Sequence, residues 1–327
     1  MSLKNKLAEK FVNTDAIAEI IEIGIQTKKN VFLYGRGGHA KSEIAQAVLD
    51  YVDPQGCDSF VLACGEGLTE EKLFGGIDIA KFQKTGVIEH LVHNSFMNYK
   101  YVVFEELLDS RMNVLLSLKD ILTSGKFRHG NQTFKIKTEF VLCLTNRTKQ
   151  EVAEDNSVKA LLERFPLEMK VEWDRYNQED YERMFFKVLG KNYTEVARIC
   201  HVINDTGEFV SPRTAIHMAQ VFQSKGLQSL RYFGMGNDII EAIQKEEKDR
   251  TDVSFLKHYI DSYDNLKMES NIPSVKAFIK ACKSIQEQIT TRGYSDKVFP
   301  LFKDLREKLT SSLAQARTVL AKIVENE

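Results

Sequence analysis

Residues 31–42 read VFLYGRGGHAKS, in which a short apolar run leads directly into a glycine-rich turn that ends in lysine and serine. A helical pattern follows over 43–51. The phosphate-binding loop has the pattern G-x-x-x-x-G-K-[ST] between a strand and a helix, and the match is complete except for Ala40 in place of the last glycine. The stretch therefore predicts an α/β fold in which a buried strand leads through a phosphate-binding loop into a helix.

The residue types of this loop suit a bound nucleotide. Glycines let backbone N–H groups turn inward around phosphate oxygens, and the amino end of the following helix adds positive potential. Lys41 can reach the β- and γ-phosphates, and the hydroxyl of Ser42 can ligate Mg²⁺. We expect Ala40 at backbone angles that suit a Cβ atom and His39 on the solvent side of the loop; the alternative is a glycine-rich turn that binds nothing. The predicted nucleotide-binding residues are Gly35, Arg36, Gly37, Gly38, His39, Ala40, Lys41, Ser42 and Glu43.

A second motif supplies two acids. Residues 101–106 read YVVFEE, an apolar strand pattern that ends in two glutamates. An ATPase needs a carboxylate at the tip of a neighbouring strand to organise Mg²⁺ and the attacking water. We predict that Glu105 joins Ser42 at the metal and acts through water, and that Glu106 polarises the attacking water as the general base. The two motifs together predict ATP and Mg²⁺ as cofactors, although a strand can also end in two acids without a function.

Apolar runs and helical patterns alternate in the first half of the chain, as in a parallel sheet covered by helices. Most of the runs lack polar alternation, which is typical of strands that are buried on both faces. The expected strands are 31–34, 60–64, 101–104, 140–144 and 167–171. After Trp173 the pattern is helical, so we predict a nucleotide-binding domain over 1–173, a helical lid over 174–235 and a helical C-terminal region over 236–327.

The composition is that of an ordinary globular protein with balanced charge. The 45 basic and 46 acidic residues give a formal net charge of −1, which disfavours DNA or RNA as the main partner because nucleic-acid binders usually carry a basic surplus. Five cysteines without a CxxC pair disfavour structural zinc and suit reduced thiols. The first residues lack the apolar core of a signal peptide, and no apolar run reaches about 18 residues. We therefore expect a soluble, cytoplasmic protein without a membrane span.

Together these motifs resemble the AAA+ superfamily of ATPases, and within it the MoxR-like members of the helix-2-insert group. The segment LFGGID at 73–78 is similar to a Leu-Phe/Leu-Gly segment of that family, and 84–98 occupies the place of its inserted β-hairpin. Residues 113–123 correspond to the helix after the acidic motif. Residues 126–137 alternate around His-Gly-Asn and independently predict a second hairpin, which the resemblance implies to project toward a pore and touch substrate.

Three further residues match motifs in the family's order along the chain. Asn146, after the strand at 140–144, looks like sensor 1, an amide that positions water and senses the γ-phosphate. Arg164 in LLERF resembles the arginine that serves the neighbouring subunit, and Arg213 in Ser-Pro-Arg resembles sensor 2 of the lid. Each has a structural alternative: a strand-end turn, a surface helix residue and an ordinary helix start, respectively. The predicted catalytic residues are Glu106, Asn146, Arg164 and Arg213.

The resemblance covers 28–223 and implies a homo-oligomeric ring, with a hexamer as the expected size. It implies that Mg-ATP hydrolysis remodels or matures a protein client, as in MoxR-like chaperones that work with a von Willebrand A-type partner. Two other functions stay open. A nucleic-acid motor would explain the basic residues of the second expected hairpin, and a nucleotide-dependent scaffold with little turnover would explain Ala40 and Glu105, which depart from the usual motifs. No motif places the chain beyond residue 233.

Overall fold

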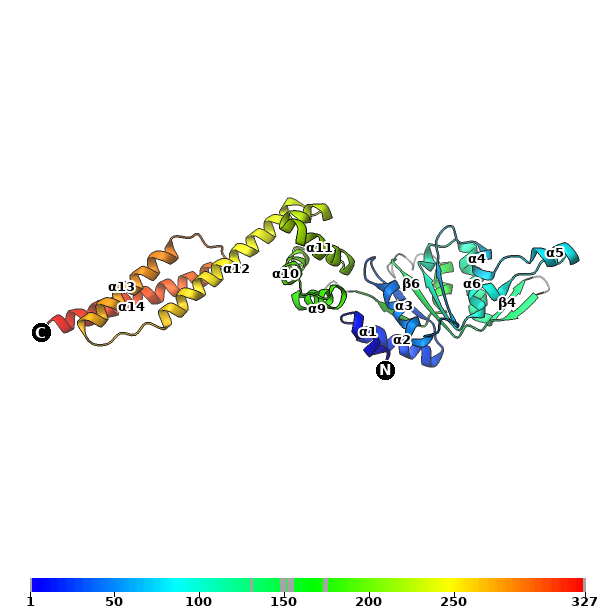
Figure 1. Cartoon of the computed structure of the whole chain (residues 1–327), viewed down its shortest axis with the longest axis horizontal. Coiled ribbons are helices and arrows are strands. Elements are labelled where there is room, and N and C mark those ends of the chain that lie inside the picture. Colours follow the sequence, from blue (N-terminus) through cyan, green and yellow to red (C-terminus); the bar gives the residue numbers. More distant parts are fainter. Residues whose placement is uncertain (1, 130–131, 148–150, 152–155, 173–175, 326–327) are drawn as a thin grey trace. The chain divides into compact units, whose positions relative to one another are not determined.

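The structure is a computed structural model that describes residues 2–129, 132–147, 151, 156–172 and 176–325. The chain divides into two compact units, Met1–Phe233 and Gly234–Glu327 (Figure 1). The predicted boundary at Trp173 lies outside the described residues. Within them, no helix combines the length and apolar content that crossing a membrane requires.

A five-stranded sheet forms the centre of the first unit, and every neighbouring pair of strands is parallel. The order across the sheet is β2-β3-β6-β1-β7. The strands are β1 (Val31–Tyr34), β2 (Ser59–Ala63), β3 (Tyr101–Glu105), β6 (Phe140–Thr145) and β7 (Leu167–Lys170). Each expected strand is present and ends within one residue of its predicted limits, so the parallel α/β fold is confirmed.

Helices cover both faces of the sheet and then continue as a helical segment of the same unit. The α-helices of this unit are α1 (Leu3–Lys10), α2 (Asp15–Thr27), α3 (Lys41–Val52), α4 (Glu70–Phe74), α5 (Ile79–Thr85), α6 (Met112–Ser124), α8 (Asn156–Leu162), α9 (Gln178–Leu189), α10 (Thr194–Asp205) and α11 (Pro212–Lys225). The 3₁₀ turns are η1 (Val92–Asn94), η2 (Phe96–Asn98), η3 (Leu107–Asp109) and η4 (Gly226–Phe233).

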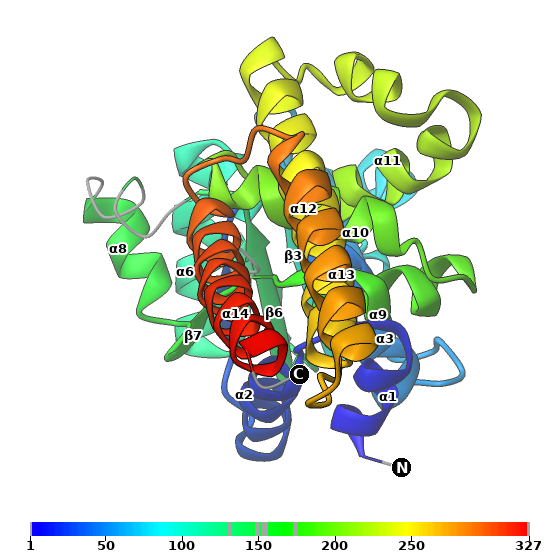
Figure 2. The same ribbon diagram turned by 90° about the vertical axis from the view of Figure 1, so that its left-hand side faces the viewer.

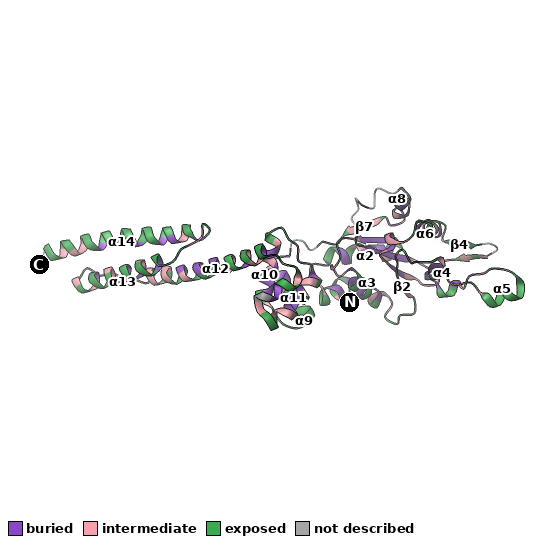
Figure 3. Cartoon of the chain, turned by 90° about the horizontal axis from the view of Figure 1, so that it is seen from above, coloured by how far each residue is buried: buried purple, intermediate pink, exposed green. Residues whose placement is uncertain are grey.

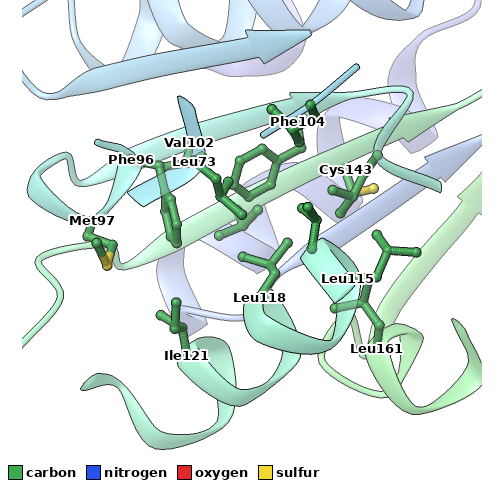
Figure 4. Close-up of a cluster of buried hydrophobic side chains, with 14 of the residues drawn as sticks. Leu73, Phe96, Met97, Val102, Phe104, Leu115, Leu118, Ile121, Cys143 and Leu161 are labelled. Carbon is green, nitrogen blue, oxygen red and sulfur yellow. The ribbon is translucent and has the colours of Figure 1, made fainter. Parts of the chain in front are cut away.

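One face of the sheet packs on α6. Alternate strand residues such as Phe104 and Cys143 point to this face and meet Leu115 and Leu118 of α6 in a buried apolar cluster (Figure 4). Burying a side chain of this size contributes roughly 1.5–3 kcal/mol. Figure 3 shows the buried residues concentrated in the strands and the helix faces against them. The expected helix at 113–123 is present as α6, and its buried face packs into this core.

The opposite face of the sheet is approached closely by α2. A Cβ atom added to Gly24 would lie 2.6 Å from a methyl group of Val31 and 2.8 Å from the ring of Phe140. Only a glycine lets the helix backbone come this near to the strands, since any side chain would have to occupy that space. This contact fixes α2 against β1 and β6, the two strands that border the loop at 35–40.

The segment from 84 to 98 does not form the expected hairpin. Asp78 caps α5, since its side chain accepts a hydrogen bond of 2.9 Å from the amide of Lys81, and Gly86 ends the helix in a left-handed conformation. The β-structure here is one isolated antiparallel bridge between Ile77 and His90. The capped helix ends where the segment begins, and the 3₁₀ turns η1 and η2 occupy the rest of it in place of strands.

The second expected hairpin is present. β4 (Lys126–His129) and β5 (Gln132–Lys135) pair antiparallel, from Lys126↔Lys135 to His129↔Gln132. The side chain of Gln132 also bonds the backbone amide and carbonyl of His90, at 3.0 and 3.1 Å, and so ties this hairpin to the segment that follows α5. Gly130 and Asn131, at its predicted turn, lie outside the described residues.

The second unit consists of α12 (Asn237–Asp264), α13 (Ile272–Thr290) and α14 (Phe299–Glu325), which pack side by side (Figure 2). Its core includes Leu256 of α12, Cys282 of α13 and a stripe of α14 that contains Leu305 and Leu309. A helical C-terminal region was expected, and the apolar stripe of its last helix is core of this unit.

Replacing Gly24 by alanine should lower the free energy of unfolding by about 1–3 kcal/mol, because the added methyl group overpacks the contact with Val31 and Phe140. Urea denaturation followed by circular dichroism would measure the change. The matched control is Gly67→Ala, since a Cβ atom at that position meets nothing within 4 Å. Equal stability of the two variants would contradict the close packing of α2 on the sheet.

Candidate nucleotide site

The loop at 35–40 lies at the carboxyl end of β1 and leads into α3. Its path depends on two glycines. Gly35 has φ +145°, and a Cβ atom there would lie 2.4 Å from the carbonyl oxygen of Val171. Gly38 has φ +79°, and a Cβ atom there would lie 2.7 Å from Oγ of Ser211. The glycines are therefore required both by backbone angle and by the close approach of β7 and of the start of α11.

Ala40 adopts left-handed backbone angles, with φ +55° and ψ +26°. The expectation that its angles suit a Cβ atom is wrong, because this region costs an L-residue roughly 1–2 kcal/mol. The position is one that the phosphate-loop pattern gives to glycine. The loop nevertheless has the shape that leads into α3, since the amide of Ile44 donates to the carbonyl of Ala40 at 2.9 Å.

Lys41 connects the loop to the neighbouring strand. Its ammonium group donates to the carbonyls of Gly35 and Arg36, at 2.8 and 2.9 Å, and to Oδ1 of Asn146 at 2.7 Å. Lys41 is only 6% exposed. Burial lowers its pKa below the ordinary value, while the nearby carboxylate of Glu106 acts in the opposite direction. The structure thus brings Lys41 and Asn146 together, and both follow the carboxyl ends of adjacent strands.

The two acids occupy different positions at the end of β3. Glu105 is the last residue of the strand, half-buried between Ala63 of β2 and Leu144 of β6. Glu106 leaves the strand with φ +52°, and its Oε2 accepts a hydrogen bond of 3.0 Å from the amide of Asn146. Glu106, Asn146 and Lys41 therefore form one connected chain of contacts at the carboxyl edge of the sheet.

Arg213 also approaches the loop. Its amide donates to the carbonyl of Gly38 at 3.3 Å, and its guanidinium lies 3.9 Å from the carboxylate of Glu43. Both side chains of this ion pair are more than half exposed, so the pair adds little stability. Ser42 lies between Lys41 and Glu43 in the first turn of α3 and is exposed. Arg213 and Ser42 are thus available to a ligand at the loop.

His39 is buried, with 1% of its surface exposed, so its expected place on the solvent side of the loop is wrong. Its Nδ1 lies 2.8 Å from the carbonyl oxygen of Arg36 and 3.1 Å from that of Gly37. The imidazole stacks on the ring of Phe209, a residue that no sequence motif indicates. The contact between these two distant parts of the chain removes His39 from solvent.

Arg164 lies away from the site residues at the carboxyl edge of the sheet. Its Nε donates to Oγ1 of Thr123 at 2.7 Å, and its carbonyl accepts from Asn30, which immediately precedes β1, at 2.9 Å. Arg164 therefore lies at the amino ends of the strands, whereas the loop lies at their carboxyl ends. It cannot serve the site of its own chain from this position, because the length of a strand separates them.

A cavity of about 360 Å³ adjoins the loop. Its lining combines Gly38, Ala40 and Arg213 with mostly apolar residues of α1, α9, α11 and the segments beside them. The hydroxyl of Tyr176 donates to the carbonyl of Val12 at 3.0 Å and holds two parts of this lining together. No periodic pattern or motif indicates this cavity, since its lining comes from four separate segments of the chain.

The residues around the loop fit a nucleotide. A metal ion at this site would need the phosphate oxygens of that nucleotide as ligands. An apolar cavity beside glycine N–H groups and a buried lysine matches an aromatic base followed by phosphates. Among the described residues, no three His, Cys, Asp or Glu side chains form a group that could hold a metal ion. Mg²⁺ commonly binds through one or two protein ligands together with phosphate oxygens, which is the arrangement that Ser42 and Glu105 allow.

The parallel sheet, with a loop of the phosphate-binding pattern between β1 and α3, defines an α/β fold of the P-loop NTPase class. Residues 1–197 match the family model described as the MoxR domain in the MoxR-vWA-beta-propeller ternary systems. Because the match covers more than half of the chain, the protein belongs to the MoxR family of AAA+ ATPases. The expected family is confirmed. No curated protein matches the chain.

Several solved structures are similar at low identity. A Cytophaga hutchinsonii crystal structure described as an ATPase has 14% identity and a TM-score of 0.43, over 99% of this chain and 92% of that one. Brucella abortus NtrX in complex with ATP has 12% identity and a TM-score of 0.47, over 93% and 67%. The S. cerevisiae Hsp104-ADP complex has 12% identity and a TM-score of 0.43, over 70% and 47%. These likenesses are too distant to support a statement about function.

Replacing Ala40 by glycine should raise the free energy of unfolding by up to about 1 kcal/mol, because glycine adopts the left-handed conformation without strain but loses more entropy on folding. Thermal or urea unfolding would measure the gain. The control is Ala45→Gly, which makes the same change inside α3 and should destabilise by about 1 kcal/mol. A loss of stability in both variants would contradict the left-handed conformation of Ala40.

Proposed function

We propose that this protein is a ring-forming ATPase that couples Mg-ATP hydrolysis to the remodelling or maturation of a protein client. The observation that carries the proposal is the chain of contacts from Glu106 through Asn146 to Lys41 beside the phosphate loop. It joins a carboxylate, an amide and a buried cation at one edge of the sheet, which are the groups that phosphoryl transfer to water requires. The proposed domains are 1–173, 174–235 and 236–327.

ATP would bind with its base in the apolar cavity and its phosphates against the loop at 35–43. Mg²⁺, held by Ser42 and through water by Glu105, would neutralise phosphate charge when bound. Glu106 takes a proton from the attacking water as the water oxygen bonds to the γ-phosphorus and the bond to the ADP oxygen breaks. The backbone amide of Asn146 holds the Glu106 carboxylate by a hydrogen bond. Arg213 connects the phosphates to α11.

Arg164 supports the ring. At the amino edge of the sheet it is remote from its own loop but half-exposed, with 31% of its side chain accessible. A neighbouring copy, arranged head to tail, would receive this guanidinium at its own phosphates, where such an arginine is typically worth about 10³–10⁵ in rate. Head-to-tail contacts close into rings when the rotation allows, and a hexamer is the proposed size.

A protein client is supported by the surface of α5 and its flanks. Ile79 and Phe82 are 65% and 45% exposed, and none of the residues of α5 is buried (Figure 3). Ile79 and Phe82 are three residues apart and share one face of the helix, which gives α5 an apolar surface of the kind that contacts other proteins. The family's description names systems with von Willebrand A-type proteins, so such a partner is proposed here. The net charge of −1 favours a protein client over a nucleic acid. The five free cysteines favour the cytoplasm as the location of the protein.

Glu106→Gln should reduce ATP turnover by at least about 100-fold and leave ATP affinity nearly unchanged, because the amide cannot accept the proton of the attacking water. Phosphate release and equilibrium binding of ATP would be measured, with Glu19→Gln, an exposed acid on α2, as the control. Normal turnover in the variant would remove Glu106 as the general base.

The same measurements on the wild-type protein separate the alternative functions. Tight ATP binding without turnover would favour the scaffold, and stimulation of turnover by DNA would favour the nucleic-acid motor.

Mixing two inactive variants should restore turnover if Arg164 acts on the neighbouring site. Arg164→Ala keeps an intact loop, and Lys41→Ala keeps the arginine. In a random one-to-one ring, about a quarter of the interfaces would then combine an intact loop with an intact arginine. Phosphate release would be measured across protein concentrations while mass photometry follows assembly. Rings of mixed composition that stay inactive would contradict the role of Arg164.

A further inference from the structure

We propose that Phe209 positions the phosphate loop through His39, so that the helical segment of α9–α11 controls the direction of the amide groups that receive the nucleotide phosphates. The proposal rests on the proposed function, since it concerns the same loop. It makes Phe209 and His39 positioning residues: neither is required to touch the reacting atoms.

His39 fixes two peptide planes of its own loop. Its Nδ1 lies within hydrogen-bond distance of the carbonyl oxygens of Arg36 and Gly37, at 2.8 and 3.1 Å. Both partners are acceptors, so Nδ1 carries the proton and donates. In a trans peptide the N–H points opposite to the C=O. The imidazole therefore sets the direction of the amides of Gly37 and Gly38, which face away from the ring.

Phe209 fixes the imidazole. The two rings lie parallel within 4° at a centroid distance of 5.2 Å, and the guanidinium carbon of Arg36 lies 5.8 Å from the centroid of the same phenyl ring. Stacked aromatic pairs and cation–π contacts are favourable at these separations. One side chain from outside the loop thus contacts two loop residues, and both of them take part in the hydrogen bonds that shape it.

Phe209 is itself held firmly by the helical segment. It lies between α10 and α11, and the next residue, Val210, is completely buried. The carbonyl of Val210 accepts a hydrogen bond from the hydroxyl of Tyr181 at 2.9 Å, and its amide donates to Asn204 at 3.0 Å. Any displacement of α9 and α10 would therefore carry the phenyl ring with it.

A second contact runs in parallel with the ring stack. Beyond Val210, the amide of Arg213 donates to the carbonyl of Gly38, and Oγ of Ser211 occupies the space where a Cβ atom of Gly38 would be. The loop is thus contacted at two consecutive residues, Gly38 and His39, by one short segment. When that segment moves, the phosphate-binding amides and Arg213 move together, which gives the helices a direct mechanical connection to the phosphates.

A double-mutant cycle on ADP affinity tests the connection. Phe209→Ala and His39→Ala should each weaken binding of fluorescently labelled ADP, and the double variant should lose at least about threefold less than the product of the single effects. The conservative variant Phe209→Tyr keeps the stacked ring and should therefore bind labelled ADP as tightly as the wild type. Phe186→Ala is the matched control, because it removes an exposed phenyl group of α9. Multiplicative losses, or no rescue by tyrosine, would overturn the proposal.

Hydrogen exchange without nucleotide separates this proposal from the proposed function. The amides of Gly35 and Arg213 donate hydrogen bonds that hold the two ends of the loop region, at 3.2 Å to Thr145 and 3.3 Å to Gly38. They should exchange several-fold faster in Phe209→Ala than in the wild type, with no change in Phe186→Ala and with melting temperatures that show each variant folded. Unchanged exchange in a folded Phe209→Ala would overturn the positioning role even if ADP binds. A wild-type protein that fails to bind ADP would instead refute the proposed function, and the exchange result would still decide the role of Phe209.

Discussion

The arrangement of the site depends on the buried ammonium group of Lys41. A lysine that is 6% exposed must have its donors satisfied, since an isolated buried charge is costly. The ammonium has three protons, and the structure gives it three acceptors: two carbonyls of its own loop and Oδ1 of Asn146. The nearby carboxylate of Glu106 favours the charged form. One cation therefore ties the loop after β1 to the end of β6 and, through Asn146, to the residue after β3.

This linkage is possible only because of the strand order. β6 lies between β1 and β3, so Asn146 stands between Lys41 and Glu106 and contacts both. All five strands of this sheet run parallel, which collects these three residues at one edge and leaves Arg164, which precedes β7, at the other. The same topology thus keeps Arg164 away from the loop of its own chain. Under the proposed function, this guanidinium would act on the loop of a second copy.

The sequence was sufficient where the signal was local. Unbroken apolar runs located the five strands, and the loop pattern located Lys41 and Gly35 in their strand-to-helix context. It failed where a contact between distant segments decides the outcome. His39 is polar and lies in a glycine-rich turn, which suggested exposure, but Phe209 covers it from far along the chain. The cavity beside the loop was likewise invisible, because its lining is assembled from separate segments. The helix α5 was not expected, although Asp78 and Gly86 are residue types that commonly cap a helix.

Backbone strain marks two positions at the site. Among the described residues, the non-glycine positions with positive φ are Asn13, Lys28, Ala40 and Glu106. Asn13 is a residue type that tolerates this region, and Lys28 ends α2, where such a conformation is common. Ala40 and Glu106 have no such explanation, and both lie at the site. At Glu106 the left-handed turn redirects the chain after β3, so that the carboxylate reaches the amide of Asn146 instead of following the pleat of the strand. A strained residue persists where the surrounding contacts hold it, and here those contacts are the same hydrogen bonds that join Glu106, Asn146 and Lys41.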